Sequence, residues 1–392
     1  MNFCLWYAVI WIFVLVLYGL QWSDLNAPLT PGLLAFFLIT IIVSLILGFA
    51  NRKRFKFLEI PKLGKPYKSM IVPIVLGFMA EMIYSRQVPL IAIALGRSQY
   101  TEFTGFPVFH VLLLTYACYY GLCAACRYRG TGDKKHLYEF LVIVLLYLLI
   151  FSRASLIVLA FCFICVMISG NNLFVRHTKT ILYLIPLLFI IITYAFGILG
   201  NIRCGCAWND CTVINEIGQY NARYPAWLPD EFKWAYTYIT SPLANLNNGI
   251  LTNGVNLSAG NYFKSFVPDF LSKRLFPGFR DNLPEFRSIA DLNAIVGLYS
   301  YYYYGGLWGA LGAFAWLVVC PTLLFRFHFF SNYDDYFPAL LVCNFLAVFV
   351  FFWDVIYLSQ CSFILVYPIL FSLFGRRKSK LDPRNILMRN WR

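Results

Sequence analysis

Three ionisable side chains have the chemistry of a general base and stand at the edges of apolar stretches. Glu81 lies near the end of one apolar run, where an acidic group is costly and is therefore a candidate for function. His110 lies one turn inside the next run, and an imidazole can exchange a proton at physiological pH. Asp291 begins a short polar stretch further along. We predict that one of these three is the catalytic base. In the alternative, the site positions the acceptor hydroxyl without a strong base. In the alternatives, Glu81 forms an ion pair with Arg86, and His110 makes a structural hydrogen bond.

Cationic side chains gather in the polar stretch 200–293 and at two short turns before it. A guanidinium offers a planar fork of donors that matches phosphate oxygens, so several converging Arg can hold a pyrophosphate. We predict that six residues bind a phosphate-bearing ligand: Arg86, Arg153, Lys273, Arg274, Arg280 and Arg287. The alternative is surface ion pairs with Asp269, Asp281 or Glu285, each worth about 0–1 kcal/mol. Arg153 could also be a simple interfacial anchor.

Amide and phenol side chains in the same half of the chain can contact a sugar. We assign Asn245, Asn293 and Tyr304 to substrate binding. The amides can hydrogen-bond sugar hydroxyls, although Asn is commoner as a turn residue. Tyr304 ends a tyrosine-rich boundary that also has the composition of an interfacial belt.

The elements that position these residues are expected to be membrane-spanning helices. The chain is 60% hydrophobic and only 13% charged, whereas soluble domains have about 25% charged residues. The apolar runs are long and continuous, as in helices that cross a bilayer, instead of alternating as in barrel strands. We predict an all-α, polytopic integral membrane protein with about ten spans. These are Phe3–Leu20, Gly32–Ala50, Met70–Tyr84, Pro107–Cys126, Leu137–Phe151, Leu156–Ser169, Ile181–Leu199, Gly305–Phe325, Phe337–Phe352 and Ile356–Phe374.

The spans divide the chain into four parts. Residues 1–199 form an N-terminal bundle of about seven spans, 200–293 a large external segment, 294–374 about three further spans, and 375–392 a basic tail. Most Lys and Arg fall on the side that holds both termini, which places that side in the cytoplasm. The net charge of +14 is therefore mainly a topology signal, and we do not expect a nucleic-acid partner.

Local signals add two expectations within the external segment. The stretch that starts at Phe232 has aromatic residues at helical spacing, and Ser241-Pro242 is expected to interrupt that helix. Cys204, Cys206 and Cys211 lie where disulfides are permitted, and we expect one bridge with Cys211 as a partner.

Metal-binding patterns are absent from the sequence. Cys123-x-x-Cys126 has redox or zinc spacing but no second pair nearby, so we interpret it as helix packing. The four His are far apart in sequence. We expect neither a metal nor another cofactor.

In order and placement, these residues resemble the Wzy-type oligosaccharide repeat-unit polymerases of bacterial O-antigen and capsule assembly. The resemblance covers most of the chain, although each motif alone is weak. It is carried by Glu81, Val88-Pro89-Leu90, Tyr100, Phe103-Thr-Gly-Phe-Pro and His110, by Ser152-Arg153, by Tyr238-Ile-Thr-Ser-Pro-Leu-Ala-Asn245, and by Asp291-x-Asn293 ahead of Tyr304-Gly-Gly.

The resemblance implies a metal-independent integral-membrane glycosyltransferase of the C-type fold, similar in fold to O-antigen ligases. Such an enzyme joins undecaprenyl-pyrophosphate-linked oligosaccharide units at the periplasmic face of the inner membrane, in lipopolysaccharide or capsule biosynthesis. It implies the lipid bilayer, a chain-length regulator and a flippase of the same pathway as partners. The alternatives are an O-antigen ligase, which accepts lipid A–core, and a lipid-linked-oligosaccharide flippase. We further expect Phe263–Asn293 to fold over Arg153 and the Glu81–His110 hairpin.

Overall fold

The computed structural model describes residues 1–53, 55, 69–95, 105–168, 178–281, 283–284, 286–287, 289, 291–292, 294–330 and 333–374, with side-chain environments left out for 93–94 and 178–186. Three predictions fall outside these residues. They are the substrate-binding role of Asn293, the motif residues Tyr100 and Phe103, and the basic tail 375–392.

Helices make up the regular structure of the described residues. The first half of the chain forms α1 (Phe3–Gly19), α2 (Pro31–Ala50), α3 (Ile71–Tyr84), α4 (Pro89–Ala94), α5 (Phe109–Thr131), α6 (Lys134–Leu149), α7 (Arg153–Ile168) and α9 (Thr178–Arg203). The external segment forms α10 (Thr212–Gly218), α11 (Phe232–Asn253), α12 (Ala259–Ser265) and α13 (Asp269–Leu275). The last part forms α14 (Tyr299–Phe314), the π-helix η1 (Ala315–Val319), α15 (Cys320–Arg326), α16 (Tyr333–Phe349), α17 (Ser359–Ser362), the 3₁₀-helix η2 (Phe363–Leu365) and α18 (Val366–Phe374).

The all-α prediction is confirmed for the described residues, where the extended pairing is one isolated bridge between Ser23 and Tyr220. By length and composition, three helices in the described part can cross a membrane: Pro31–Ala50, Phe109–Thr131 and the continuous Tyr299–Arg326. Five shorter apolar helices accompany them. Several long apolar helices are consistent with a membrane protein, and the count of ten spans stays a prediction.

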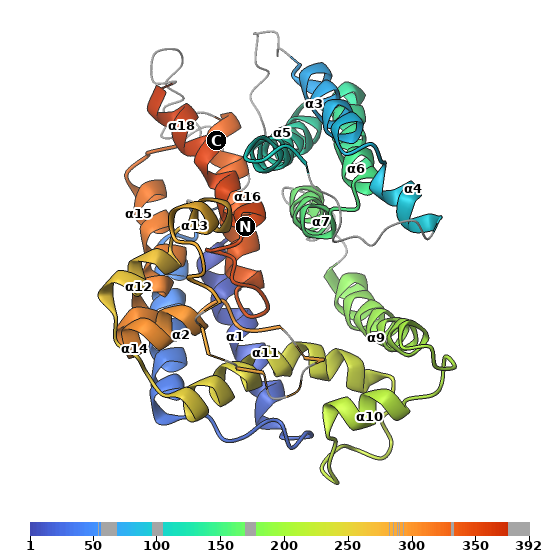
Figure 1. The fold of residues 1–392 in the computed structure, drawn as a ribbon, viewed down its shortest axis with the longest axis vertical. Helices are drawn as coiled ribbons and strands as arrows, with labels where there is room; N and C mark the ends of the chain where they lie inside the picture. Colours follow the sequence, from blue (N-terminus) through green and yellow to red (C-terminus); the bar gives the residue numbers. More distant parts are fainter. Residues whose placement is uncertain are drawn as a thin grey trace.

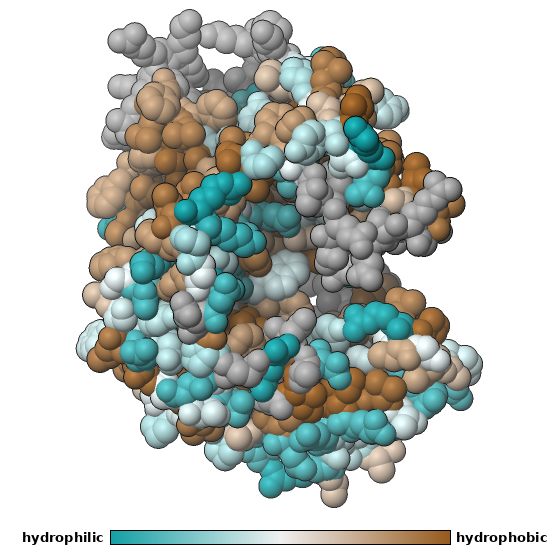
Figure 2. Space-filling model, viewed as in Figure 1, coloured by the Kyte–Doolittle hydropathy of each residue, from teal (hydrophilic) through white to brown (hydrophobic). Residues whose placement is uncertain are grey.

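Outward-facing apolar side chains follow the helical period, as expected for helices that contact lipid. On α2, the exposed residues include Leu34, Leu38, Ile42, Ile46 and Phe49, which share one face. Figure 2 shows apolar surface over the edge formed by α15 and α18, and hydrophilic side chains gathered at the bottom of the view, over α10. A soluble monomer rarely exposes apolar patches of this extent.

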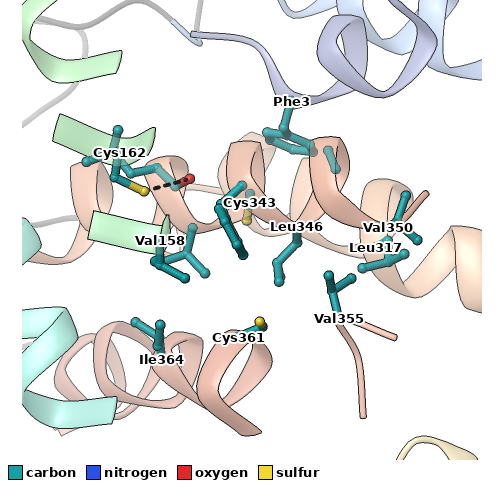
Figure 3. Close-up of a cluster of buried hydrophobic side chains, with 14 of the residues drawn as sticks. Phe3, Val158, Cys162, Leu317, Cys343, Leu346, Val350, Val355, Cys361 and Ile364 are labelled. Atoms are coloured by element: carbon teal, nitrogen blue, oxygen red, sulfur yellow. Dashed lines mark hydrogen bonds between the residues drawn. The ribbon is translucent and has the colours of Figure 1, made fainter. Parts of the chain in front are cut away.

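Helix α16 lies at the centre of the fold and joins two groups of helices. It packs against α1 on one side and against α5 and α7 on the other. Figure 1 shows α3 to α7 on the right and α1, α2 and α14 to α18 on the left. The buried side chains around α16 form one continuous core, part of which is drawn in Figure 3: Cys343, Leu346 and Val350 contact neighbours from several helices.

The predicted break at Ser241-Pro242 is wrong, because α11 continues through Pro242 to Asn253. A proline inside a helix removes one hydrogen bond and costs about 3 kcal/mol. Tertiary packing offsets that cost here, since α11 contacts α1, α9, α10 and α14 and buries residues on both sides of Pro242. In Figure 1, α11 crosses the bottom of the molecule and connects the α9–α10 corner to α14.

Candidate active site

Glu81 and His110, which the sequence singled out separately, form a pair in the structure. His110 Nδ1 lies 2.7 Å from Glu81 Oε2. The Glu81 side chain is fully buried at the end of α3, whereas the His110 side chain retains 24% exposure at the start of α5. The pairing of Glu81 with His110, and not with Arg86, gives the carboxylate a partner that can itself carry a proton.

Gly105 packs directly on this pair. A Cβ atom at Gly105 would lie 2.6 Å from His110 Nδ1 and 2.7 Å from Glu81 Oε1, so no side chain fits unless the pair moves apart. Glu81 Oε1 is buried without a hydrogen-bond partner among the described atoms. A buried acceptor of this kind is costly, which makes the pair a site for function more than for stability.

Arg280 and Asp354 form a second pair, between the external segment and the turn that precedes α17. The guanidinium Nη2 lies 2.7 Å from Asp354 Oδ2, and both side chains are mostly buried. The guanidinium carbon also lies 3.7 Å from the centroid of the Tyr357 ring, in a cation–π contact. Burial raises the pKa of Asp354, and the attraction of Arg280 opposes that shift.

Helix α13 is fastened to the same turn. Asp269 Oδ1 accepts hydrogen bonds from Ser359 N, at 3.0 Å, and from the Ser359 hydroxyl, while Asp269 N donates to Tyr357 O at 2.8 Å. Helix α12 packs on α14, where the Tyr301 hydroxyl donates to Ser265 O at 2.8 Å. The segment that carries most predicted cations therefore rests on the last helices of the chain, and its predicted contact with Arg153 stays a prediction.

Aromatic rings connect this segment to the helix that carries His110. Phe270 on α13 lies edge-on to Phe363 at 5.0 Å, and Phe363 is in turn edge-on to Tyr367 at 6.3 Å. The Tyr367 hydroxyl donates to Leu112 O at 2.9 Å, two residues after His110. These contacts link α13 to α5 through η2 and α18.

The other predicted cations have different environments. Arg86 is exposed at a positive φ of 53° just after α3. Arg153 begins α7, and its guanidinium lies 5.1 Å from the Phe151 ring. Lys273 is exposed beside Asp269 at 3.9 Å, which is the surface ion pair considered as its alternative. Arg274 donates to Phe270 O on its own helix.

Two predicted residues of the loop before α14 are exposed. Arg287 and Asp291 both point to solvent-accessible positions. Asp291 is exposed, whereas Glu81 is buried against His110. The geometry therefore favours the Glu81–His110 pair as the catalytic base.

Asn245 and Tyr304 are buried parts of the framework. Asn245 donates to Leu292 O at 2.6 Å and to Ala294 O at 2.8 Å, which holds the loop before α14. Tyr304 is 3% exposed and stacks on Phe279 at 5.8 Å, next to Arg280. In the described structure both residues act on the position of the candidate site, and direct contact with a sugar stays a prediction.

The expected disulfide is wrong for the described structure, because Cys204, Cys206 and Cys211 are all free. Cys211 is buried against Asn201, whose Nδ2 lies 3.4 Å from its sulfur, while Cys204 is exposed. The three thiols lie in one short stretch, but Cys204 follows the end of α9 at the surface, whereas Cys211 is buried at the start of α10. Among the described residues, no three or more His, Cys, Asp or Glu side chains form a group that could hold a metal ion.

No protein-family model, curated protein or solved structure matches the chain. The functional conclusion therefore rests on the residues and their geometry.

Sequence reasoning missed how three residues contribute. Asp354, Tyr357 and Gly105 are not among the site residues predicted from the sequence. The signal for Asp354 was that it is the only charged residue between Asp335 and Arg376, in an otherwise apolar stretch. No sequence signal distinguishes Gly105 from an ordinary turn glycine.

Proposed function

We propose that this chain is a metal-independent glycosyltransferase of the bacterial inner membrane that polymerises undecaprenyl-pyrophosphate-linked oligosaccharide units. The observation that carries the proposal is the Glu81–His110 pair, a buried carboxylate against a partly exposed imidazole. The cation-rich segment around α13, which two ring contacts and one hydrogen bond link to α5, supports it. Both termini are proposed to be cytoplasmic, with residues 200–293 on the periplasmic side.

The pair supplies the proton acceptor that the transfer requires. With the Nδ1 proton donated to Glu81, Nε2 is the ring atom that can take the proton of the acceptor hydroxyl. That hydroxyl oxygen attacks the anomeric carbon of the donor sugar. The bond from this carbon to the pyrophosphate oxygen breaks, and the electron pair leaves with undecaprenyl pyrophosphate. Glu81 stabilises the imidazolium that results and holds the ring in position.

Cationic side chains stabilise the leaving group. A pyrophosphate gains negative charge as the glycosidic bond breaks, so guanidinium groups placed in advance lower the barrier. Arg280 is the best-ordered candidate, because Asp354 and Tyr357 hold it from two sides. Arg153, Arg274 and Arg287 are the further cations proposed for the same ligand.

The test uses membranes that contain the protein and the lipid-linked repeat unit of the host strain. We expect chain extension without added metal or ATP. His110→Ala and Glu81→Gln should each lower extension strongly, while Asp281→Ala, which removes an exposed carboxylate, should not. Full activity of both His110→Ala and Glu81→Gln would contradict the assignment of the base.

A deletion strain distinguishes the enzyme classes. Loss of a polymerase leaves a single repeat unit on the lipid A–core, whereas loss of a ligase or flippase leaves none. The lipopolysaccharide ladder on a gel therefore separates the proposal from both alternatives.

A further inference from the structure

An apolar groove of about 250 Å³ lies along the last helices of the chain. Its walls come from η1, α15 and α18, with Leu317 and Leu346 at its floor. Those two residues belong to the packed core drawn in Figure 3, so the floor of the groove is rigid. Along α15 the lining runs from Cys320 to Leu324, and the external segment contributes Phe266 and Pro268.

The shape of the groove depends on an irregular turn of helix. Pro321 has no N–H, so the carbonyl four residues before it loses its normal donor. The chain responds with a wider turn, in which Cys320 N donates to Ala315 O across the π-helix Ala315–Val319. Such single π-turns often occur at functional sites. Here the wide turn and the small side chain of Cys320 leave space where a regular Leu-rich helix would fill it.

Two residues that line the groove directly precede Tyr357 and Asp269, which contact Arg280 and hold α13. Ile356 lines the groove and is followed directly by Tyr357, on whose ring Arg280 lies. Pro268 also lines the groove and is followed by Asp269, which donates its N–H to Tyr357 O at 2.8 Å and fastens α13 to Ser359. The lining of the groove is therefore one residue along the chain from the ring on which the Arg280 guanidinium lies.

We propose that this groove holds the first part of the polyprenyl chain of the lipid-linked substrate, with its pyrophosphate at Arg280. The inference rests on the proposed function and names which surface receives the lipid. A phosphate attached to an apolar chain needs a cation close to an apolar channel, and here consecutive residues, Ile356 and Tyr357, join the groove to the Arg280 guanidinium. The methyl branches of a polyprenyl chain need a wider channel than a straight acyl chain, which the π-helix supplies.

The probe for the test is a polyprenyl pyrophosphate that carries a diazirine in its first isoprene units. It is added to the full-length protein in nanodiscs, irradiated, and the labelled peptide is identified by mass spectrometry. We expect label on the η1–α15 peptide. Unlabelled polyprenyl pyrophosphate should compete, whereas phosphatidylglycerol at the same mole fraction should not.

A matched pair of variants tests the groove itself. Leu324→Trp fills the groove, while Leu323→Trp places the same side chain on the neighbouring exposed position of α15, which does not line it. We expect Leu324→Trp to weaken probe binding about tenfold, equivalent to about 1.4 kcal/mol. Leu323→Trp should bind the probe as the wild-type protein does.

The outcomes separate this inference from the proposed function. Chain extension with label elsewhere, or with equal competition by phosphatidylglycerol, overturns the groove and leaves the polymerase proposal standing. Specific label on η1–α15 without chain extension supports the groove and counts against the polymerase. Equal binding of the probe by the two Trp variants also overturns the groove.

Discussion

Glu81 occupies an environment that would be a poor choice for stability alone. Its side chain is fully buried, one oxygen faces His110, and the other has no hydrogen-bond partner among the described atoms. Replacing such a group with an apolar residue is often neutral or stabilising. Its presence is therefore better explained by chemistry at His110 than by folding.

Gly105→Ala tests how closely the pair must be held. The added methyl group has no room beside His110 Nδ1 and Glu81 Oε1, so it must move them apart. We expect chain extension to fall about 100-fold, as for a misplacement of about 1 Å in an active site. The control is Gly260→Ala in α12, where the added methyl meets nothing within 4 Å. Extension rate per folded molecule is measured for both, and equal rates would contradict the prediction.

Arg280 requires a double variant, because removing one member of a buried ion pair leaves the other uncompensated. Arg280→Ala should lower the free energy of unfolding by about 3 kcal/mol, the lower end for buried pairs, since both side chains keep some solvent contact. Adding Asp354→Ala should restore most of the thermal stability. If Arg280 binds pyrophosphate, the double variant stays inactive although it is stable.

Thermal melting and chain extension are measured on the same preparations of these variants. An active double variant would show that Arg280 serves the fold alone.

At the scale of elements, the contact between α13 and α17 determines where the cation-rich segment lies. Asp269 joins the two through Ser359, and hydrogen bonds to a charged group contribute about 1.5–3 kcal/mol each. The rest of α13 is short and exposes Lys273 and Arg274. The helix is therefore held by few contacts.

Asp269→Ala should release α13. A loss of about 2 kcal/mol increases the detached population roughly 30-fold. Trypsin cleavage after Lys273 and Arg274 should accelerate accordingly in membrane vesicles. Asp281→Ala, which removes an exposed carboxylate nearby, is the control. Equal cleavage of the two variants would rule out that Asp269 holds α13 against Ser359.

The existence of most helices could be predicted from the sequence, while their ends and breaks could not. Long apolar runs specify a helix wherever the backbone must satisfy its own hydrogen bonds. The predicted helix break at Pro242 was wrong, because the packing of α11 against four other helices outweighs the local cost of a proline inside a helix. The wide turn before Pro321 gave no signal, since nothing in the sequence distinguishes a π-turn from a kink.

The candidate site was predictable as a set of residues and not as a set of contacts. Glu81 and His110 were recognisable as polar groups in apolar runs, but their pairing joins positions 29 residues apart. Arg280 and Asp354 are separated by 74 residues. The sequence does not tell which of several opposite charges will form an ion pair over such a separation. Asn245 was assigned to sugar binding, and its burial against the loop before α14 became visible only in the structure.

For the whole molecule, the proposed topology can be tested by thiol labelling. The variants Trp227→Cys and Lys134→Cys are made in a Cys204→Ser, Cys206→Ser background, because those two native thiols lie at the surface. With a membrane-impermeant maleimide on spheroplasts, Cys introduced at the exposed Trp227 should react at once. Cys introduced at Lys134 should react only after lysis. Labelling of both before lysis would contradict the proposed orientation.

The turn between α1 and α2 carries a consequence for synthesis of the chain. Ser23 and Thr30 find their hydrogen-bond partners at Gly218 and Asn247, 195 and 217 residues later. A ribosome adds about 5–20 residues per second, so these groups wait roughly 10–40 seconds before their partners emerge. In the proposed topology, the first helical hairpin is inserted during that interval before its periplasmic end has its hydrogen-bond partners. An insertase or a quality-control protease therefore has a defined period in which to bind or degrade this hairpin. A chain truncated before α11 should be degraded faster than a chain truncated after α11.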